Sequence, residues 1–204
     1  MNARSPRLLA AWGPSNSGKT TALLALLREL KRRGARVLVA KGIHREGVAF
    51  DVVGKDTWKY RRGGADCVLA NAGDEVVAFL PPRTGTLSSV EDLARRLEVD
   101  YLLVEGFKVG VASREPPVPT VACARRVEDL GGGRWPPVPW TLCVTGPVVD
   151  QLGAVGSYRG VPALDALGDP EAFARRVLAL VEAGEEASRA AHPRANAGTG
   201  EDET

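Results

Sequence analysis

The stretch Gly13-Pro-Ser-Asn-Ser-Gly-Lys-Thr20 constrains this chain most strongly, because it matches the phosphate-binding pattern G-x-x-x-x-G-K-[ST] at every fixed position. The apolar run 8–12 predicts a short buried strand before it, and residues 20–33 predict a helix after it. In that setting the glycines let backbone N–H groups curl toward phosphate oxygens, and the helix start adds unpaired N–H groups and a favourable dipole. A chance glycine-rich turn is the alternative, and the strand–loop–helix placement argues against it. The sequence therefore predicts a nucleoside triphosphate as the ligand.

Two side chains of this loop have expected chemical roles. Lys19 is predicted to reach the β- and γ-phosphates, and the Thr20 hydroxyl is predicted to bind Mg²⁺. The predicted nucleotide contacts along the loop are Gly13, Ser15, Asn16, Ser17, Gly18, Lys19, Thr20 and Thr21.

The rest of the chain alternates strand and helix patterns, which predicts an α/β fold: a mainly parallel sheet with helices on both faces. The expected strands are 36–40, 67–70, 75–80, 101–104, 118–124 and 141–144, and the expected helices are 56–62, 88–97 and 170–183. A turn at Asn71–Asp74 indicates a β-hairpin insertion, and Ser89 is the expected cap of the helix 88–97. We expect one nucleotide-binding domain over residues 1–183 and a disordered tail over residues 184–204.

Composition excludes several classes of function. The net charge of +2 leaves no broad basic surface for nucleic acid, and no apolar stretch reaches the length that spans a membrane. Cys67, Cys123 and Cys143 are widely spaced in apolar runs, which predicts reduced, buried thiols in a cytoplasmic protein. No cysteine–histidine spacing suggests structural zinc.

Ligands of open parallel sheets bind where the strands end, so the residues after each strand are candidates for the site. Glu105 follows the buried run 102–104, where its carboxylate is suited to hold Mg²⁺ or to polarise an attacking water. Taken alone, Glu105 is equally an ordinary polar residue at a strand end.

Two further loops after strands are candidates for ligand contacts. Lys41, His44 and Arg45 are placed to meet the γ-phosphate or a second anion, and the alternative is a solvated basic loop. The loop Thr145–Asp150 is the candidate for binding the base, with Thr145 as its first contact. The Asn-Lys-x-Asp signature for guanine is absent from the sequence.

Three blocks of sequence together resemble the molybdopterin-guanine dinucleotide biosynthesis adaptor family, MobB. The first is the phosphate loop with its helix. The second is Asp51-Val-Val-Gly-Lys-Asp-Thr-Trp58, which read alone indicates only that Asp56 and Thr57 cap a short helix. The third is Tyr101-Leu-Leu-Val-Glu-Gly-Phe-Lys108, similar to the family signature Val-Glu-Gly-Phe-Lys.

The resemblance implies a homodimeric P-loop α/β protein that binds GTP with Mg²⁺ and hydrolyses GTP slowly. It also implies that the protein assists a molybdopterin guanylyltransferase, with contact to molybdopterin itself left open. Lys19 and Glu105 would then serve catalysis, and Thr20 and Glu105 the metal. Asp51, Lys55 and Asp56 would line the nucleotide or the dimer-facing site.

The chain departs from the family in two places. Family members often carry Lys-His-x-His-His after the second strand, and here the segment is Lys41-Gly-Ile-His-Arg45. Val53 replaces the usual proline. Roles of the missing histidines therefore do not carry over.

Two other functions fit the phosphate loop. A small-molecule kinase would need an acceptor site and a lid, for which residues 109–119 are the candidate segment. A GTPase that delivers a metal would need a cysteine–histidine site, and the sequence offers none at suitable spacing.

Overall fold

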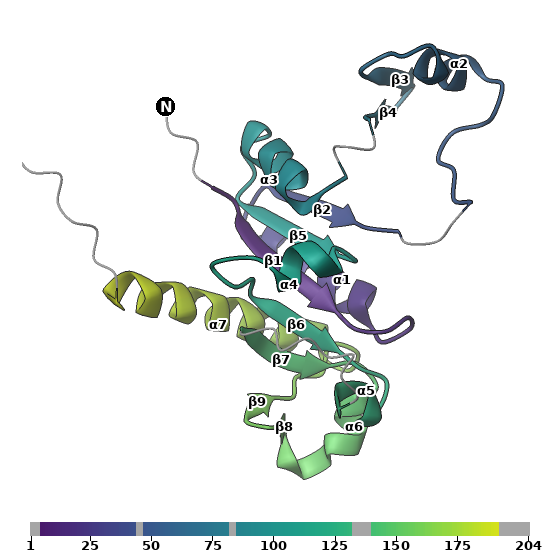
Figure 1. Cartoon of the computed structure of the whole chain (residues 1–204). Helices are drawn as coiled ribbons and strands as arrows, with labels where there is room; N and C mark the ends of the chain where they lie inside the picture. The colour runs from purple at the N-terminus through teal and green to yellow at the C-terminus, as the bar shows by residue number, and fades with distance from the viewer. Residues whose placement is uncertain (1–4, 44–46, 82–84, 132–139, 192–204) are drawn as a thin grey trace, which may run out of the picture.

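The computed structural model describes residues 5–43, 47–81, 85–131 and 140–191. Its centre is a five-stranded sheet of parallel neighbours in the order β2-β5-β1-β6-β7 (Figure 1). These strands are Arg7–Trp12 (β1), Val37–Lys41 (β2), Tyr101–Glu105 (β5), Thr120–Cys123 (β6) and Thr141–Thr145 (β7). The predicted α/β class with a mainly parallel sheet is confirmed.

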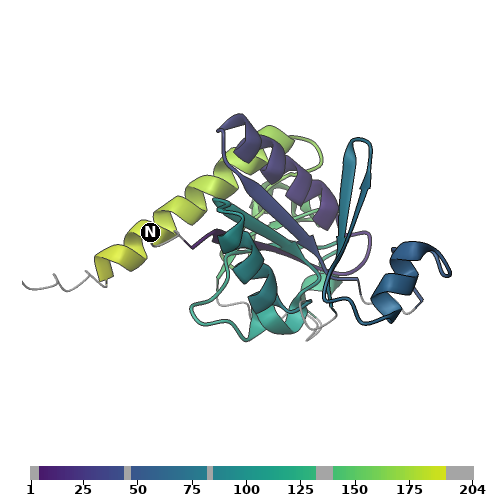
Figure 2. The ribbon, with the colours of Figure 1, turned by 90° about the horizontal axis from the view of Figure 1, so that it is seen from above.

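Helices cover both faces of this sheet, as Figure 2 shows. The main ones are α1 (Lys19–Arg32) and α7 (Pro170–Ala191) on one face, with α3 (Leu87–Arg96) and α4 (Lys108–Ala112) on the other. Alternate strand residues supply the two cores: Leu9 and Leu103 pack under α1 and α7, whereas Ala10 and Leu102 pack under α3 and α4. Both faces of β1 and β5 are therefore buried, which explains their continuous apolar sequences.

A small unit lies beside the β7 edge of the sheet. Its elements are α5 (Glu128–Gly131), α6 (Val148–Leu152), the 3₁₀ turn η2 (Gly153–Val155), β8 (Ser157–Tyr158) and β9 (Val161–Pro162). Leu130, Val144 and Val148 form its buried centre. Elements of two to five residues are too short for a hydrophobic pattern to repeat, so the sequence did not predict them.

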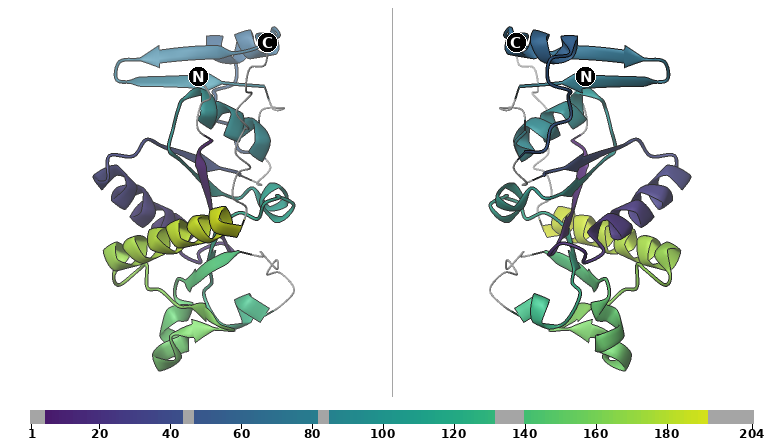
Figure 3. Two further views of the ribbon diagram at one scale, coloured as in Figure 1. Left: turned by 90° about the vertical axis from the view of Figure 1, so that its left-hand side faces the viewer. Right: turned by 90° about the vertical axis from the view of Figure 1, so that its right-hand side faces the viewer.

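Residues 48–81 form a separate arm beyond β2 and α3 (Figures 1 and 3). The arm contains α2 (Asp56–Arg62) and the antiparallel hairpin of β3 (Val68–Ala72) and β4 (Glu75–Phe79). The predicted β-hairpin insertion is thus confirmed. Among the helices that the structure describes, none has the length and apolar character to cross a membrane.

Four expectations from the sequence were wrong. Asp56 and Thr57 do not cap α2, because its N-cap residue is Lys55 and both predicted residues lie inside the helix. The helix α3 is capped by Thr86, whose hydroxyl accepts a hydrogen bond from the Ser89 N–H, and Ser89 itself lies inside the helix. The last helix does not stop at residue 183, because it runs on to Ala191, so the predicted tail is helical over 184–191. Residues 192–204 lie outside the described part. Cys67 is exposed at the start of the hairpin, whereas Cys123 and Cys143 are buried as predicted.

Candidate functional site

The loop from Gly13 to Gly18 joins β1 to α1 at the carboxyl edge of the sheet. Gly13 has a φ of 154° and lies so close to the Cys123 carbonyl on β6 that an added Cβ would collide with that oxygen. Gly18 sits at the N-cap of α1 with a left-handed φ of 90°. The first glycine therefore permits the sheet contact, and the second turns the chain into the helix.

The Lys19 ammonium lies over the loop. Its Nζ donates a hydrogen bond of 2.5 Å to the Pro14 carbonyl, which also accepts the Ser17 hydroxyl at 2.9 Å. Cys123 lies beneath, and burial raises the pKa of its thiol to about 12, so the thiol is neutral at physiological pH. Of these two side chains, Lys19 is therefore the charged one.

Glu105, at the end of β5, links three of the predicted site residues. Its Oε2 accepts the Thr20 hydroxyl at 3.2 Å and lies 3.6 Å from Lys41 Nζ. Its Oε1 lies 4.0 Å from Lys19 Nζ. The carboxylate is nearly buried, whereas Lys41 is half exposed. The structure thus gathers Lys19, Thr20, Lys41 and Glu105 into one cluster, as expected for residues at the ends of adjacent strands.

Backbone contacts between the ends of β2 and β5 fix the position of Glu105 in this cluster. The Gly42 N–H donates a hydrogen bond of 2.7 Å to the Glu105 carbonyl, which continues the β2–β5 pairing by one residue. Gly106 has a φ of 90°, and an added Cβ there would collide with the Gly42 carbonyl. The close approach of two backbones at this point therefore requires glycine at position 106.

A cleft of about 950 Å³ opens over the loop and the cluster. Its lining residues are 13–21, Lys41, Gly42, Ile43, Val48, Glu105, Gly106, Lys108, Pro147 and Leu167. Because this set includes every predicted contact of the loop, the geometry offers one continuous groove for an elongated anionic ligand.

Four predicted site residues do not line this cleft. Asp51 lies in the arm, where its side chain accepts hydrogen bonds from the Thr57 hydroxyl and from Arg61. Burial raises the pKa of Asp51, but the bonds from Thr57 and Arg61 outweigh it and hold that pKa below its ordinary value. Asp56 pairs with Lys59 of its own helix, and Lys55 is the exposed N-cap residue of α2. Nucleotide roles for Asp51, Lys55 and Asp56 remain predictions.

Thr145 is the fourth of these residues. Its buried hydroxyl accepts the Ala166 N–H at 3.1 Å and so anchors the segment that follows β9. Its neighbours Pro147 and Leu167 line the cleft instead. The predicted base loop thus reaches the cleft, two residues after the predicted contact. His44 and Arg45 lie outside the described residues.

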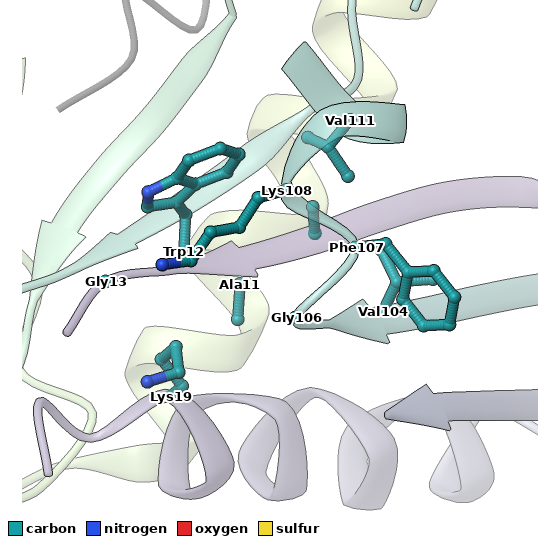
Figure 4. Close-up of a pocket in the computed structure, with 10 residues that line it drawn as sticks. Ala11, Trp12, Gly13, Lys19, Val104, Gly106, Phe107, Lys108 and Val111 are labelled. Carbon is teal, nitrogen blue, oxygen red and sulfur yellow. The ribbon is translucent and has the colours of Figure 1, made fainter. Parts of the chain in front are cut away.

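Sequence reasoning left Leu167 out of the expected site, and it covered Pro147 only as part of the predicted base loop and Lys108 only as a charge after Glu105. Pro147 and Leu167 carry no chemical signature, so only the fold reveals their position. Figure 4 shows the Lys108 side chain reaching back along the carboxyl end of β1 toward Gly13. The position of Lys108 three residues after Glu105 predicts a positive charge near the mouth of the site, and Lys108 does line the cleft.

Among the described residues, no group of three or more histidine, cysteine, aspartate or glutamate side chains is placed to hold a metal ion. The Thr20 hydroxyl and the Glu105 carboxylate, which share a hydrogen bond, are the neighbouring oxygen groups beside the phosphate loop that could bind a metal ion.

The parallel sheet, its helices and the loop from Gly13 to Thr20 define a P-loop NTPase fold. A sequence model of the family described as "Molybdopterin guanine dinucleotide synthesis protein B", MobB, matches residues 8–114. The chain belongs to the MobB family.

Named relatives agree with this membership. The chain is 36% identical over 128 residues to the molybdopterin-guanine dinucleotide biosynthesis adapter protein of Haemophilus influenzae, covering 62% of this chain and 67% of that protein. It is 34% identical over 119 residues to a probable adapter protein of the same name from Bacillus subtilis, covering 58% of this chain and 65% of the other. The alignments thus span about two thirds of each relative.

Solved structures show the same architecture. The crystal structure of Bacillus subtilis MobB superposes with a TM-score of 0.64 at 26% identity, covering 86% of this chain and 97% of that one. A MobB homologue from Bacillus stearothermophilus has a TM-score of 0.57 at 18% identity, covering 88% and 99%, and supports the fold alone.

Proposed function

We propose that this protein binds GTP with Mg²⁺ in the cleft over the loop from Gly13 to Thr20. The observation that carries the proposal is the cluster in which Lys19, Thr20 and Glu105 meet at the start of α1. The N–H groups of the loop and the dipole of α1, a helix of 14 residues, favour phosphate at this point. Lys19 would move from the Pro14 carbonyl to the phosphates.

The donors present fit Mg²⁺, because this ion prefers oxygen ligands and keeps several waters. Thr20 Oγ1 and Glu105 Oε2 lie 3.2 Å apart beside the proposed phosphates, and both would hold the ion directly or through water. The ion would supply charge stabilisation between the β- and γ-phosphates.

We propose only slow hydrolysis of GTP at this site. The two oxygens of Glu105 already serve the Thr20 hydroxyl, Lys19 and Lys41, which leaves little capacity to orient an attacking water. The assignment of guanine rests on family membership, and the base would lie toward Pro147 and Leu167 at the β7 end of the cleft.

The biological role that we propose is that of an adapter in molybdopterin guanine dinucleotide synthesis, as the relatives are named. The partner would be the guanylyltransferase that joins GMP to molybdopterin. A reconstituted guanylation reaction tests this role: product formation should rise when the chain and GTP are added. An unchanged yield at every concentration of the chain would refute the adapter role.

We further propose that the protein is a homodimer formed through the arm. The arm exposes large apolar side chains that no described residue covers, and an isolated two-stranded hairpin is marginally stable. These residues are Val48, Phe50, Val52, Val53, Leu69, Val76, Val77 and Leu80. We propose that the arm of a second copy of the chain covers these side chains, since each arm presents the same apolar surface to the other.

Calorimetric titration tests the nucleotide assignment. We expect one MgGTP to bind per chain, with MgATP binding at least tenfold more weakly. Equal, tight binding of both nucleotides would overturn the guanine assignment, and no heat with either would overturn the nucleotide site.

A further inference from the structure

Lys108 occupies a position in the cleft that the roles assigned so far leave unused. It is the first residue of α4 and lines both the nucleotide cleft and a small recess beside Trp12. Lys19 lines the same two cavities. In Figure 4 the Lys108 side chain turns back along the end of β1 and its nitrogen lies near Gly13.

The local structure holds this side chain over the loop. The left-handed turn at Gly106 directs the chain out of β5 and into α4. Val111 buries α4 in the core that it shares with α3, and Phe107 packs against the same core. The base of Lys108 is thus fixed at the carboxyl end of β5, next to β1.

The charges in the cleft do not balance without a ligand. Among the described lining residues Lys19, Lys41 and Lys108 are positive and Glu105 is negative, so three positive charges less one leave +2. Glu105 lies within 4.0 Å of the ammonium groups of Lys19 and Lys41. In the part of the chain that the structure describes, Lys108 has no carboxylate within ion-pairing distance. A triphosphate with Mg²⁺, of formal charge about −2, matches the excess.

The order of the strands sets the direction in which a nucleotide would lie. Pro147 and Leu167 approach the loop from the β7 side, whereas Lys41 and Lys108 approach it from β2 and β5 on the other side of β1. Thr20 and Glu105, the proposed Mg²⁺ ligands, also lie on the β5 side. With the base toward β7, the terminal phosphate therefore points toward Lys108.

We propose that Lys108 binds the terminal phosphate and makes the site prefer a nucleoside triphosphate to a diphosphate. The inference rests on the proposed nucleotide site and adds the residue that distinguishes the two ligands. Lys19 serves both β- and γ-phosphates, so it retains a partner when the γ-phosphate leaves. Lys108 would lose its partner with the γ-phosphate, because no carboxylate among the described residues lies beside its ammonium.

Calorimetry with the full chain and Mg²⁺ tests this assignment, using a slowly hydrolysed GTP analogue and GDP as probes. We expect Lys108→Gln to weaken the triphosphate at least tenfold, as a lost charge-assisted hydrogen bond does, and GDP by less than twofold. Lys108→Arg should retain most of the preference, since it keeps the charge. Lys59→Gln is the matched control, because Lys59 lies in the arm and pairs with Asp56.

Equal losses for both probes would overturn the assignment, since they would show only a general electrostatic effect. Unchanged binding of both probes would overturn it as well. Either result, obtained while the wild-type chain binds both nucleotides, leaves the proposed function intact. If the wild-type chain binds neither probe, the proposed function itself fails.

Discussion

At the scale of single residues, the phosphate loop, Glu105 and their meeting at one edge of the sheet were predictable, but the hydrogen bond between Thr20 and Glu105 was not. The motif fixes Lys19 and Thr20 by pattern, and the end of an apolar run fixes Glu105. That Glu105 binds Thr20 follows from the parallel register of β1 and β5, which pairs residues 94 positions apart. Pairing over that distance leaves no local signal in the sequence.

We expect Lys19→Ala to lower the affinity for MgGTP by about 100-fold, because a charge-assisted contact to phosphate contributes about 1.5–3 kcal/mol. The fold should persist, since the Lys19 side chain is partly exposed and, within the described residues, interacts with the Pro14 carbonyl and with Glu105. Calorimetry and circular dichroism on the same sample measure both effects. Unaltered affinity in a folded variant would contradict the assigned role.

Gly106→Ala should lower the free energy of unfolding by about 2–4 kcal/mol, because it adds a clash with the Gly42 carbonyl to an unfavourable φ. Gly34→Ala is the matched control. Its φ of 79° is similar, but nothing lies within 4 Å of an added Cβ, so a loss of about 1 kcal/mol is expected. Urea denaturation compares them, and equal losses would mean that the backbone contact adds nothing.

At the scale of elements, every long helix and every strand of the main sheet was predicted, and the errors arose from packing. The composition of residues 184–204, which are mostly small and polar, predicts a tail that begins at residue 184. In the structure α7 continues, and Trp140 lies so close to Gly184 that a Cβ there would collide with its ring. Glycine serves close packing at this position, and a sequence alone does not distinguish that use from termination.

The last turns of α1 carry a cluster whose strength should depend on pH. Glu29 accepts hydrogen bonds of 2.8 Å from Arg32 and from Arg33. Arg33 also donates a hydrogen bond to Glu182 on α7. Hydrogen bonding by Arg32, and then by Arg33, lowers the pKa of Glu29 from 4.5 to about 2. A lowered pKa stabilises the fold above about pH 4.5, and the benefit disappears as the pH falls toward 2.

We therefore expect wild type to melt at a higher temperature than Glu29→Gln at pH 6 and the difference to shrink steadily from pH 4.5 to pH 2. Thermal unfolding followed by circular dichroism across that range measures the difference. A gap between the two proteins that stays constant with pH would show that Glu29 titrates normally.

At the scale of the whole molecule, the arm is the feature that a single chain leaves unexplained. The hairpin was predicted from its alternating pattern and its turn, but its separation from the sheet was not. Secondary structure follows local rules, whereas the position of an insertion depends on what it packs against. A second copy of the chain would supply that surface.

Leu69→Lys places a charge on the exposed apolar face of the hairpin, where Leu69 is 69% exposed. We expect the wild-type mass to be twice 21.6 kDa and the variant to dissociate toward 21.6 kDa, because a buried unpaired charge is costly at an interface. Light scattering after gel filtration measures the masses. Leu97→Lys, an exposed leucine at the end of α3, is the control that should stay dimeric.

The most direct test of the central claim is an amide NMR titration of the chain with MgGTP. If the backbone of the loop binds the phosphates, the largest shifts should fall on the amides from Gly13 to Thr21, with Gly18 and Lys19 foremost. Smaller shifts are expected near Glu105, Lys108 and Leu167. Saturating nucleotide that leaves the loop amides unmoved, or that moves only amides outside the cleft, would contradict the account.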